Sequence, residues 1–147
     1  MDILDPLETA YNYLRSQGAS CFADVLHQVL SIKAAFYVSI MILAPTDSAI
    51  KRLELASGKR LADIMLLKPG IDILENHITI LPVQPGFSMF TSINWEHYGW
   101  TKEDFIAMKI KAETTIDLSE GDSSCVRILV VDSIIIHDDQ LDLLRRA

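Results

Sequence analysis

The sequence predicts an α+β fold formed by one domain that spans residues 1–147. Helical signals concentrate in the first half of the chain, strand-like segments close it, and there is no regular alternation of strand and helix. The length suits one domain with one core. Half of the residues are hydrophobic and mean hydropathy is +0.24, so the apolar surplus must fill the core or form a surface for a partner.

Two amphipathic helices are predicted at the start of the chain. Asp5 and Glu8 form a capping box around Pro6, which suits a first helical turn, and Gly18 ends the helix. Ser20 is expected to cap the second helix. The apolar face of that helix consists of Phe22, Val25, Leu26, Val29 and Leu30.

A strand buried on both faces is predicted over Phe36–Leu43, because this run is apolar and partly β-branched. The segment 44–47 is expected to stop the strand. Thr46 or Asp47 then caps a helix that ends at Gly58.

Shorter elements are predicted in the rest of the chain. Helices at 61–67 and 71–77, separated by a break at Pro69-Gly70, precede a strand at 78–81, and another helix is expected near 102–108. Further strands are predicted at 109–112, 114–118, 126–131 and 133–137.

The segment 41–50, with the sequence MILAPTDSAI, resembles the first signature of fasciclin-like domains. In that family a strand runs into Ala-Pro-Thr-Asp, and a helix with an apolar residue follows. Here Ile50 supplies the apolar residue, where the family usually has Phe. The other matching residues are Ala44, Pro45, Thr46, Asp47 and Ala49.

The resemblance extends along most of the chain. Residues 22–30 look like the family's early helix, 126–136 resemble its closing strands, and 73–77 resemble a helix that ends in Tyr-His, with Asn76 in place of Tyr. The segment around Trp95 has no clear counterpart. The resemblance implies a β-rich wedge flanked by N-terminal and central helices, and a non-catalytic role in adhesion or protein–protein contact.

Candidate partner-binding residues come from two places. The region of His77 is linked to adhesion in some members of the family, but a buried hydrogen-bonding role is the favoured interpretation of this histidine, and Asn76 in place of Tyr weakens the adhesive one. The irregular segment 87–100 gathers aromatic residues, and Trp95, Tyr98 and Trp100 are candidate interface anchors. The alternative is that these aromatics cover the core.

Charge and hydropathy argue against several classes of partner. The net charge of −7 disfavours binding to nucleic acid and anionic membranes, since Lys109, Lys111 and Arg145-Arg146 are the nearest approach to a basic cluster. The apolar run 34–44 is too short to span a membrane, so no membrane insertion is expected. Acidic residues near Met1 are unlike a signal peptide, which favours an intracellular or virion-associated protein over a secreted one.

The sequence contains few of the residue patterns that are typical of catalytic sites. His137-Asp138-Asp139 could serve a metal-dependent hydrolase, but solvated residues with Asp138 or Asp139 capping a terminal helix are the favoured interpretation. There is no nucleophile elbow and no glycine-rich phosphate loop. We therefore expect no enzyme, no metal and no cofactor. The expected partner is another protein or a second copy of the chain; the alternative function is a self-assembling structural subunit of a larger complex or virus particle.

Overall fold

The computed structural model describes residues 6–28, 40–79, 89–91, 97–99, 109–117, 125–136 and 138–147, and these form a mixed α+β fold, as predicted. The described helices are α1 (Pro6–Ser16), α2 (Ser20–Gln28), α3 (Asp47–Ser57), α4 (Leu61–Ile64), α5 (Lys68–Glu75) and α7 (Asp138–Arg146). The described strands are β1 (Ile40–Pro45), β2 (Ile78–Thr79), β3 (Met89–Thr91), β4 (His97–Gly99), β5 (Ile110–Asp117) and β6 (Cys125–Val131).

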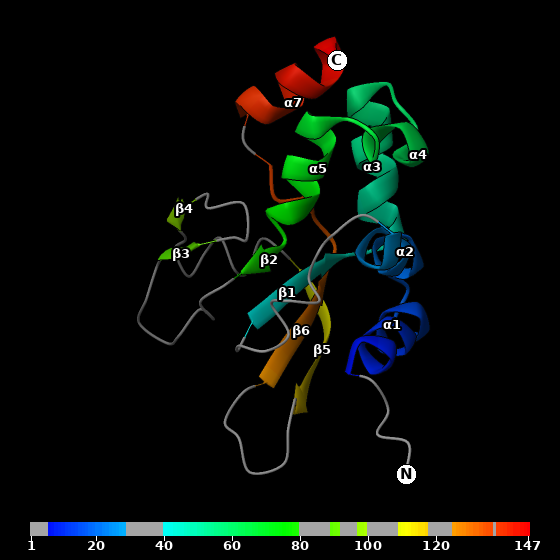
Figure 1. The fold of residues 1–147 in the computed structure, drawn as a ribbon, viewed down its shortest axis with the longest axis vertical. Helices are drawn as coiled ribbons and strands as arrows, with labels where there is room; N and C mark the ends of the chain where they lie inside the picture. The colour runs from blue at the N-terminus through cyan, green and yellow to red at the C-terminus, as the bar shows by residue number, and fades with distance from the viewer. Residues whose placement is uncertain are drawn as a thin grey trace.

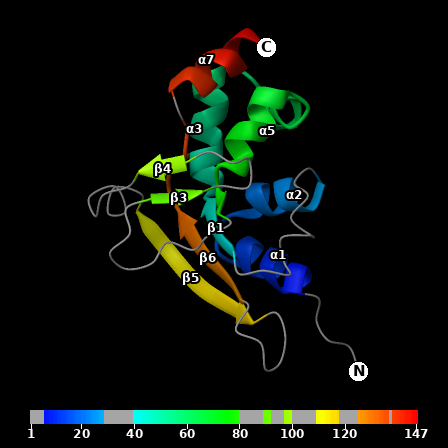
Figure 2. The same ribbon diagram turned by 60° about the vertical axis from the view of Figure 1, so that its left-hand side comes forward.

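The described strands form a four-stranded sheet in the order β2-β1-β6-β5 and a separate β3-β4 pair. The two central strands, β1 and β6, are parallel, whereas β2 and β5 pair with them antiparallel. Helices α3, α5 and α7 lie beyond the end of β1 and β6, and α1 and α2 pack beside the sheet (Figures 1 and 2). The segments that follow β1 and β6 therefore enter the same helical layer.

The core confirms the predicted buried strand at its described end, where it forms part of β1, whereas residues 36–39 of the prediction lie outside the described residues. Ile42 and Ala44 join the main apolar cluster with Phe22, while Met41 and Leu43, on the opposite face of the strand, are also buried. The predicted end of the strand is wrong. β1 continues through Pro45, which is aligned with Val131 of β6, and the chain leaves the sheet only after it. Proline lacks an N–H group but is tolerated at such a terminal position.

The predicted helix break at Pro69-Gly70 is also wrong. Pro69 lies in the first turn of α5, where its missing N–H group costs no hydrogen bond. Gly70 lies within the helix and is buried against α4, because a Cβ atom there would collide with the backbone oxygen of Ile64. The glycine therefore permits close packing of two helices. α5 ends at Glu75 and not at His77.

Two strand predictions need correction. The segments 109–112 and 114–118 belong to one strand, β5, with an irregularity between Ile110 and Ala112. Residues 133–136 are described without a strand, because the backbone groups of Ile135 bind side chains in place of a neighbouring strand. The predicted strand at 126–131 is confirmed as β6.

Most of the remaining helix signals agree with the structure where it is described, but the helix predicted at 61–67 already ends at Ile64. Gly18 and Gly58 adopt positive φ at the ends of their helices. A terminal helix is present, but Asp138 and Asp139 both lie within it, so neither is the predicted cap. Ser20 is the first residue of α2 and not the residue before it. The predicted helix near 102–108 lies outside the described residues. Within the described part of the chain, no helix has both the length and the apolar character to cross a membrane.

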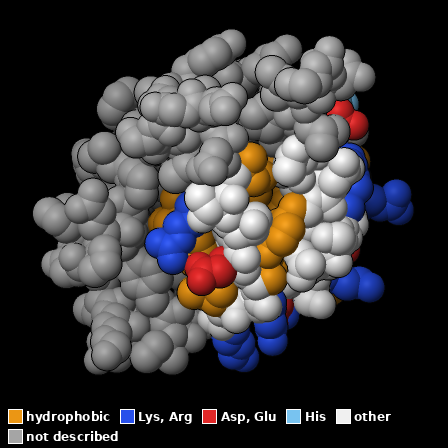
Figure 3. Space-filling model, turned by 90° about the horizontal axis from the view of Figure 1, so that it is seen from below, with side chains coloured by type: hydrophobic (Ala, Val, Ile, Leu, Met, Phe, Trp, Pro, Cys, Tyr) orange, Lys and Arg blue, Asp and Glu red, His pale blue; other side chains and the backbone are white. Residues whose placement is uncertain are grey.

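Charged side chains do not form a single-sign surface on the face seen in Figure 3. There the described Lys and Arg side chains lie apart from one another, with Asp, Glu and apolar side chains between them. Such a distribution is typical of solvated charges and unlike a phosphate-binding surface.

Candidate functional site

The segment 44–47 is a structural junction between three elements. Thr46 is the N-cap of α3: its Oγ1 accepts a hydrogen bond from the Ala49 N–H at 3.2 Å. Asp47 accepts a hydrogen bond from the Cys21 N–H at 2.9 Å, which ties α3 to α2. The Thr46 N–H donates to the oxygen of Val131 at 2.9 Å, which extends the pairing of β1 with β6. Thr46 and Asp47 thus have structural partners on α2, α3 and β6.

Asp132, directly after β6, completes this junction. Its carboxylate accepts hydrogen bonds from Thr46 Oγ1 at 2.8 Å and from Arg52 Nη2 at 2.9 Å, and Arg52 Nη2 also donates to its backbone oxygen at 2.7 Å. The hydrogen bond from Thr46 and that from Arg52 lower the pKa of Asp132 below its ordinary value. Asp132 is therefore a stably ionised carboxylate at neutral pH.

The sequence does contain a signal that places Asp132 near Thr46 and Asp47. Polar residues follow both parallel strands directly, Thr46-Asp47 after β1 and Asp132-Ser133 after β6. The carboxyl ends of neighbouring parallel strands meet at one edge of a sheet, and this edge is where open α/β sheets place their ligands. Once β1 and β6 are known to be parallel neighbours, the sequence alone predicts that these residues lie close together.

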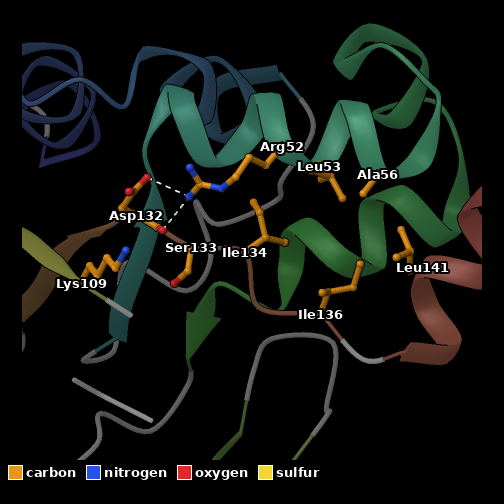
Figure 4. A pocket seen from close by; sticks show the side chains of 9 residues that line it. All are labelled: Arg52, Leu53, Ala56, Lys109, Asp132, Ser133, Ile134, Ile136 and Leu141. Carbon is orange, nitrogen blue, oxygen red and sulfur yellow. Dashed lines mark hydrogen bonds and ion pairs between the residues drawn. The ribbon is translucent and has the colours of Figure 1, made fainter. Parts of the chain in front are cut away.

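An open groove with a volume of about 540 Å³ lies next to this junction, between α3, the segment 132–136 and α7 (Figure 4). Its lining residues are Arg52, Leu53, Ala56, Lys109, Asp132, Ser133, Ile134, Ile136 and Leu141. Figure 4 shows Arg52, Lys109 and Asp132 at one end of the groove, while the apolar side chains occupy the middle and the other end. The groove is therefore amphipathic along its length.

The polar end of the groove carries excess positive charge. Arg52 neutralises Asp132, whereas no carboxylate of the described residues forms an ion pair with Lys109. Lys109 is exposed and has a φ of +55°, a conformation that costs a non-glycine residue about 1 kcal/mol or more. Its backbone oxygen accepts a hydrogen bond from the Asp132 N–H at 3.2 Å, which fixes it beside the groove.

Behind the groove, His77 is fully buried and both ring nitrogens are occupied. Nδ1 lies 3.0 Å from the oxygen of Ile73, and Nε2 accepts a hydrogen bond from the Ile135 N–H at 2.9 Å. Accepting at Nε2 requires the neutral ring, with its proton on Nδ1. Burial is the main reason that the pKa of His77 is lowered to about 4.

Asn76 and Gln140 extend this buried network to α7. Asn76 Nδ2 donates to the oxygen of Ile135 at 3.1 Å and to Oε1 of Gln140 at 2.7 Å. Together, His77 and Asn76 bind both backbone groups of Ile135. This geometry favours the structural interpretation of His77 over the partner-binding one, because its ring has no exposed surface.

The other predicted site residues are not brought to this place by the described structure. Trp95 and Trp100 lie outside the described residues. Tyr98 lies in β4, opposite Phe90 of β3, and only its backbone is described. The partner-binding role of these three aromatics stays a prediction.

The hydrolase hypothesis finds no support in the described residues. His137 lies outside them, and Asp139 is exposed on α7, where its Oδ1 accepts a hydrogen bond from the Gln140 N–H at 3.0 Å. Within the parts of the chain that are described, no group of three His, Cys, Asp or Glu side chains could hold a metal ion.

No protein-family model, curated protein or solved structure matches the chain.

Proposed function

We propose that this chain is a non-catalytic, fasciclin-type interaction domain that binds another protein or a second copy of itself. The observation that carries this proposal is the open groove, which combines an apolar floor with a lysine, Lys109, that no carboxylate of the described residues neutralises. Protein interfaces typically combine a buried apolar centre with a polar rim, and arginine is enriched in them.

The polar groups beside the groove favour binding over catalysis. Thr46 Oγ1 donates to Asp132, a pairing that resembles a nucleophile with its base. However, the same oxygen accepts the capping hydrogen bond from Ala49, and the lowered pKa of Asp132 makes it a weak base. His77, the natural general base of the region, is buried and engaged on both sides of its ring.

The fasciclin assignment is supported by how the local sequence resemblance agrees with the fold. β1 runs through Ala44-Pro45 into a helix capped by Thr46, which is what the family signature implies. His77 follows a helix in the central part of the chain, and β6 lies beside β1. This agreement supports the family through several separate segments of the chain.

Self-assembly is the second candidate, and exposed leucines favour it. Leu66, after α4, is 81% exposed, and Leu143 of α7 is 55% exposed. Leucine side chains at this level of exposure are common singly, but they gain stability when a second copy covers them. A structural subunit of a larger complex or virus particle would use such positions.

Photo-crosslinking in the native source tests the proposed function. The full chain would carry a benzophenone amino acid at Ala56, inside the groove, or at Lys51, an exposed position of the same helix outside the lining. We expect one protein, or a second copy of the chain, to be crosslinked from Ala56 and not from Lys51. That protein, once purified, should bind the chain saturably and with fixed stoichiometry in calorimetry.

The proposal fails if Ala56 and Lys51 give the same products and none of these products binds the purified chain saturably. Light scattering over a range of concentrations separates the two partners: a mass that rises with concentration indicates self-assembly, whereas a constant monomer mass indicates a different protein.

A further inference from the structure

We infer that the groove recognises an extended peptide segment in which an acidic residue lies next to apolar residues. The inference rests on the proposed function and names the chemistry of its partner. The acidic side chain would meet Lys109 and Arg52, and the apolar side chains would lie over the floor formed by α3, Ile134, Ile136 and α7.

The cationic end of the groove, formed by Arg52 and Lys109, can bind a carboxylate. Arg52 is 55% exposed and uses only Nη2 in its bonds to Asp132. A guanidinium has five N–H donors, so Nε and Nη1 can still donate to a ligand. Lys109 adds a second cation at the mouth. After Asp132 is counted against Arg52, a positive charge remains for an acidic partner to neutralise.

The apolar part of the groove selects against simple anions. Ile134, Ile136 and Leu141 are half-buried, so a ligand that covers them removes further apolar surface from water. A phosphate or a nucleic-acid backbone offers no apolar group for these positions. A peptide offers both the carboxylate and neighbouring apolar side chains.

The shape of the groove favours a peptide over a lipid-like carboxylate. The groove is open along the surface, and its volume of about 540 Å³ is enough for a few side chains. An isolated alkyl chain gains most in an enclosed cavity, where all of its surface is covered. An extended peptide can leave its own backbone in contact with water while its side chains enter the groove.

The test measures binding of a fluorescent, acetylated peptide containing aspartate-leucine-isoleucine-leucine, by anisotropy, to the full chain. A matched peptide carries asparagine in place of aspartate. We expect saturable binding, with the aspartate peptide about tenfold tighter than the asparagine peptide, as suits a charge-assisted contact at a partly exposed site. Equal affinity for the two peptides, or no saturable binding, would overturn the inference.

Two groove variants and two matched controls locate the binding. Lys109→Asn removes the cation yet tolerates positive φ, so the aspartate peptide should lose its about tenfold advantage while the fold is kept. Lys51→Gln removes a cation from outside the lining and should leave that advantage intact.

The second pair tests the apolar floor. Ala56→Glu places a carboxylate inside the groove and should abolish binding of both peptides, whereas Leu55→Glu, one residue away and outside the lining, should not. Both positions are exposed on α3, where glutamate is a good helix former, and melting temperatures would check that the variants fold. Equal effects of the two substitutions would contradict the assignment.

Decanoate, used as a competitor, distinguishes the peptide from a lipid-like carboxylate. We expect it to displace the peptide poorly; if decanoate bound more tightly than the aspartate peptide, the peptide inference would be wrong. If the peptide does not bind while the crosslinked partner binds the unaltered chain, the peptide inference fails and the proposed function stands. If neither peptide nor partner binds the unaltered chain, both fail.

Discussion

The segment 132–136 has an inner face that bonds to the core and an outer face that lines the groove. On the inner face, both backbone groups of Ile135 are hydrogen-bonded to His77 and Asn76 inside the protein. On the outer face, Ile134 and Ile136 line an open groove that ends at the cation of Lys109. Alternate residues of one short segment therefore serve the core and the groove.

The inner face therefore contributes mainly to the stability of the fold, whereas the outer face offers exposed groups to a partner. The polar groups of the inner face are hydrogen-bonded within the protein, so removing one of their partners should destabilise the fold. The outer face leaves part of its apolar surface exposed and, among the described residues, the charge of Lys109 unpaired, so changes to its exposed groups should affect binding more than stability. The inner network also holds the outer face in place, because the segment lacks the support of a neighbouring strand.

The largest effect is expected from His77→Leu. The substitution leaves the Ile135 N–H without its acceptor and removes the polar contact to the Ile73 oxygen, all in the core. We expect a loss of about 3 kcal/mol in the free energy of unfolding, measured with urea. His27→Leu, on the exposed surface of α2, should cost less than about 1 kcal/mol. Similar costs for the two variants would mean that the buried network contributes little.

Acid should weaken the inner face selectively. The folded chain keeps His77 neutral down to a pKa of about 4, whereas the unfolded chain takes up this proton near pH 6.5. Stability from this group is therefore fully present above pH 6.5 and is lost as pH falls from 6.5 to 4, by up to about 3 kcal/mol in total. Urea unfolding across this range measures it, and His77→Leu should lack this part of the slope. An identical slope in that variant would exclude His77 as its source.

A smaller effect is expected at Thr46, whose hydroxyl donates a hydrogen bond to Asp132 at the start of the segment 132–136. Thr46→Val keeps the shape of the side chain but removes the helix cap and the donor to Asp132. We expect a loss of about 1–2 kcal/mol in the free energy of unfolding and a higher pKa for Asp132, followed by NMR. Thr46→Ser retains the hydroxyl and should lose less than half as much. Thr115→Val, on the exposed surface of β5, controls for removal of a hydroxyl.

The sequence predicted the parts of the fold that depend on local chemistry. Gly18 and Gly58 end helices because they adopt positive φ, and Thr46 caps α3 through a residue three positions away. The two-sided burial of β1 and the position of β6 follow from uninterrupted apolar runs. Each of these features is specified within a few neighbouring residues.

The parts that the sequence did not predict depend on residues far apart in the chain. The apolar run at 133–137 is typical of a strand, but Ile135 bonds to His77, 58 positions earlier. The groove joins α3 to α7 and to the start of β5, which share no sequence signal. In the sequence Lys109 stands out only as part of a weak basic pair with Lys111, because a lysine does not by itself indicate positive φ.

The smallest stability effect is expected at the outer face, from Lys109→Asn. Asparagine tolerates the left-handed conformation better than lysine, so the free energy of unfolding should rise by about 0.5 kcal/mol. Lys111→Asn, within β5, should instead lower it slightly, because asparagine is disfavoured in strands. Urea unfolding of the two variants compares them directly, and a loss of stability at both positions would show that Lys109 is not strained. A gain in stability with Lys109→Asn, together with loss of the aspartate peptide's advantage over the asparagine peptide, would show that this lysine contributes charge to the groove at a cost to the fold.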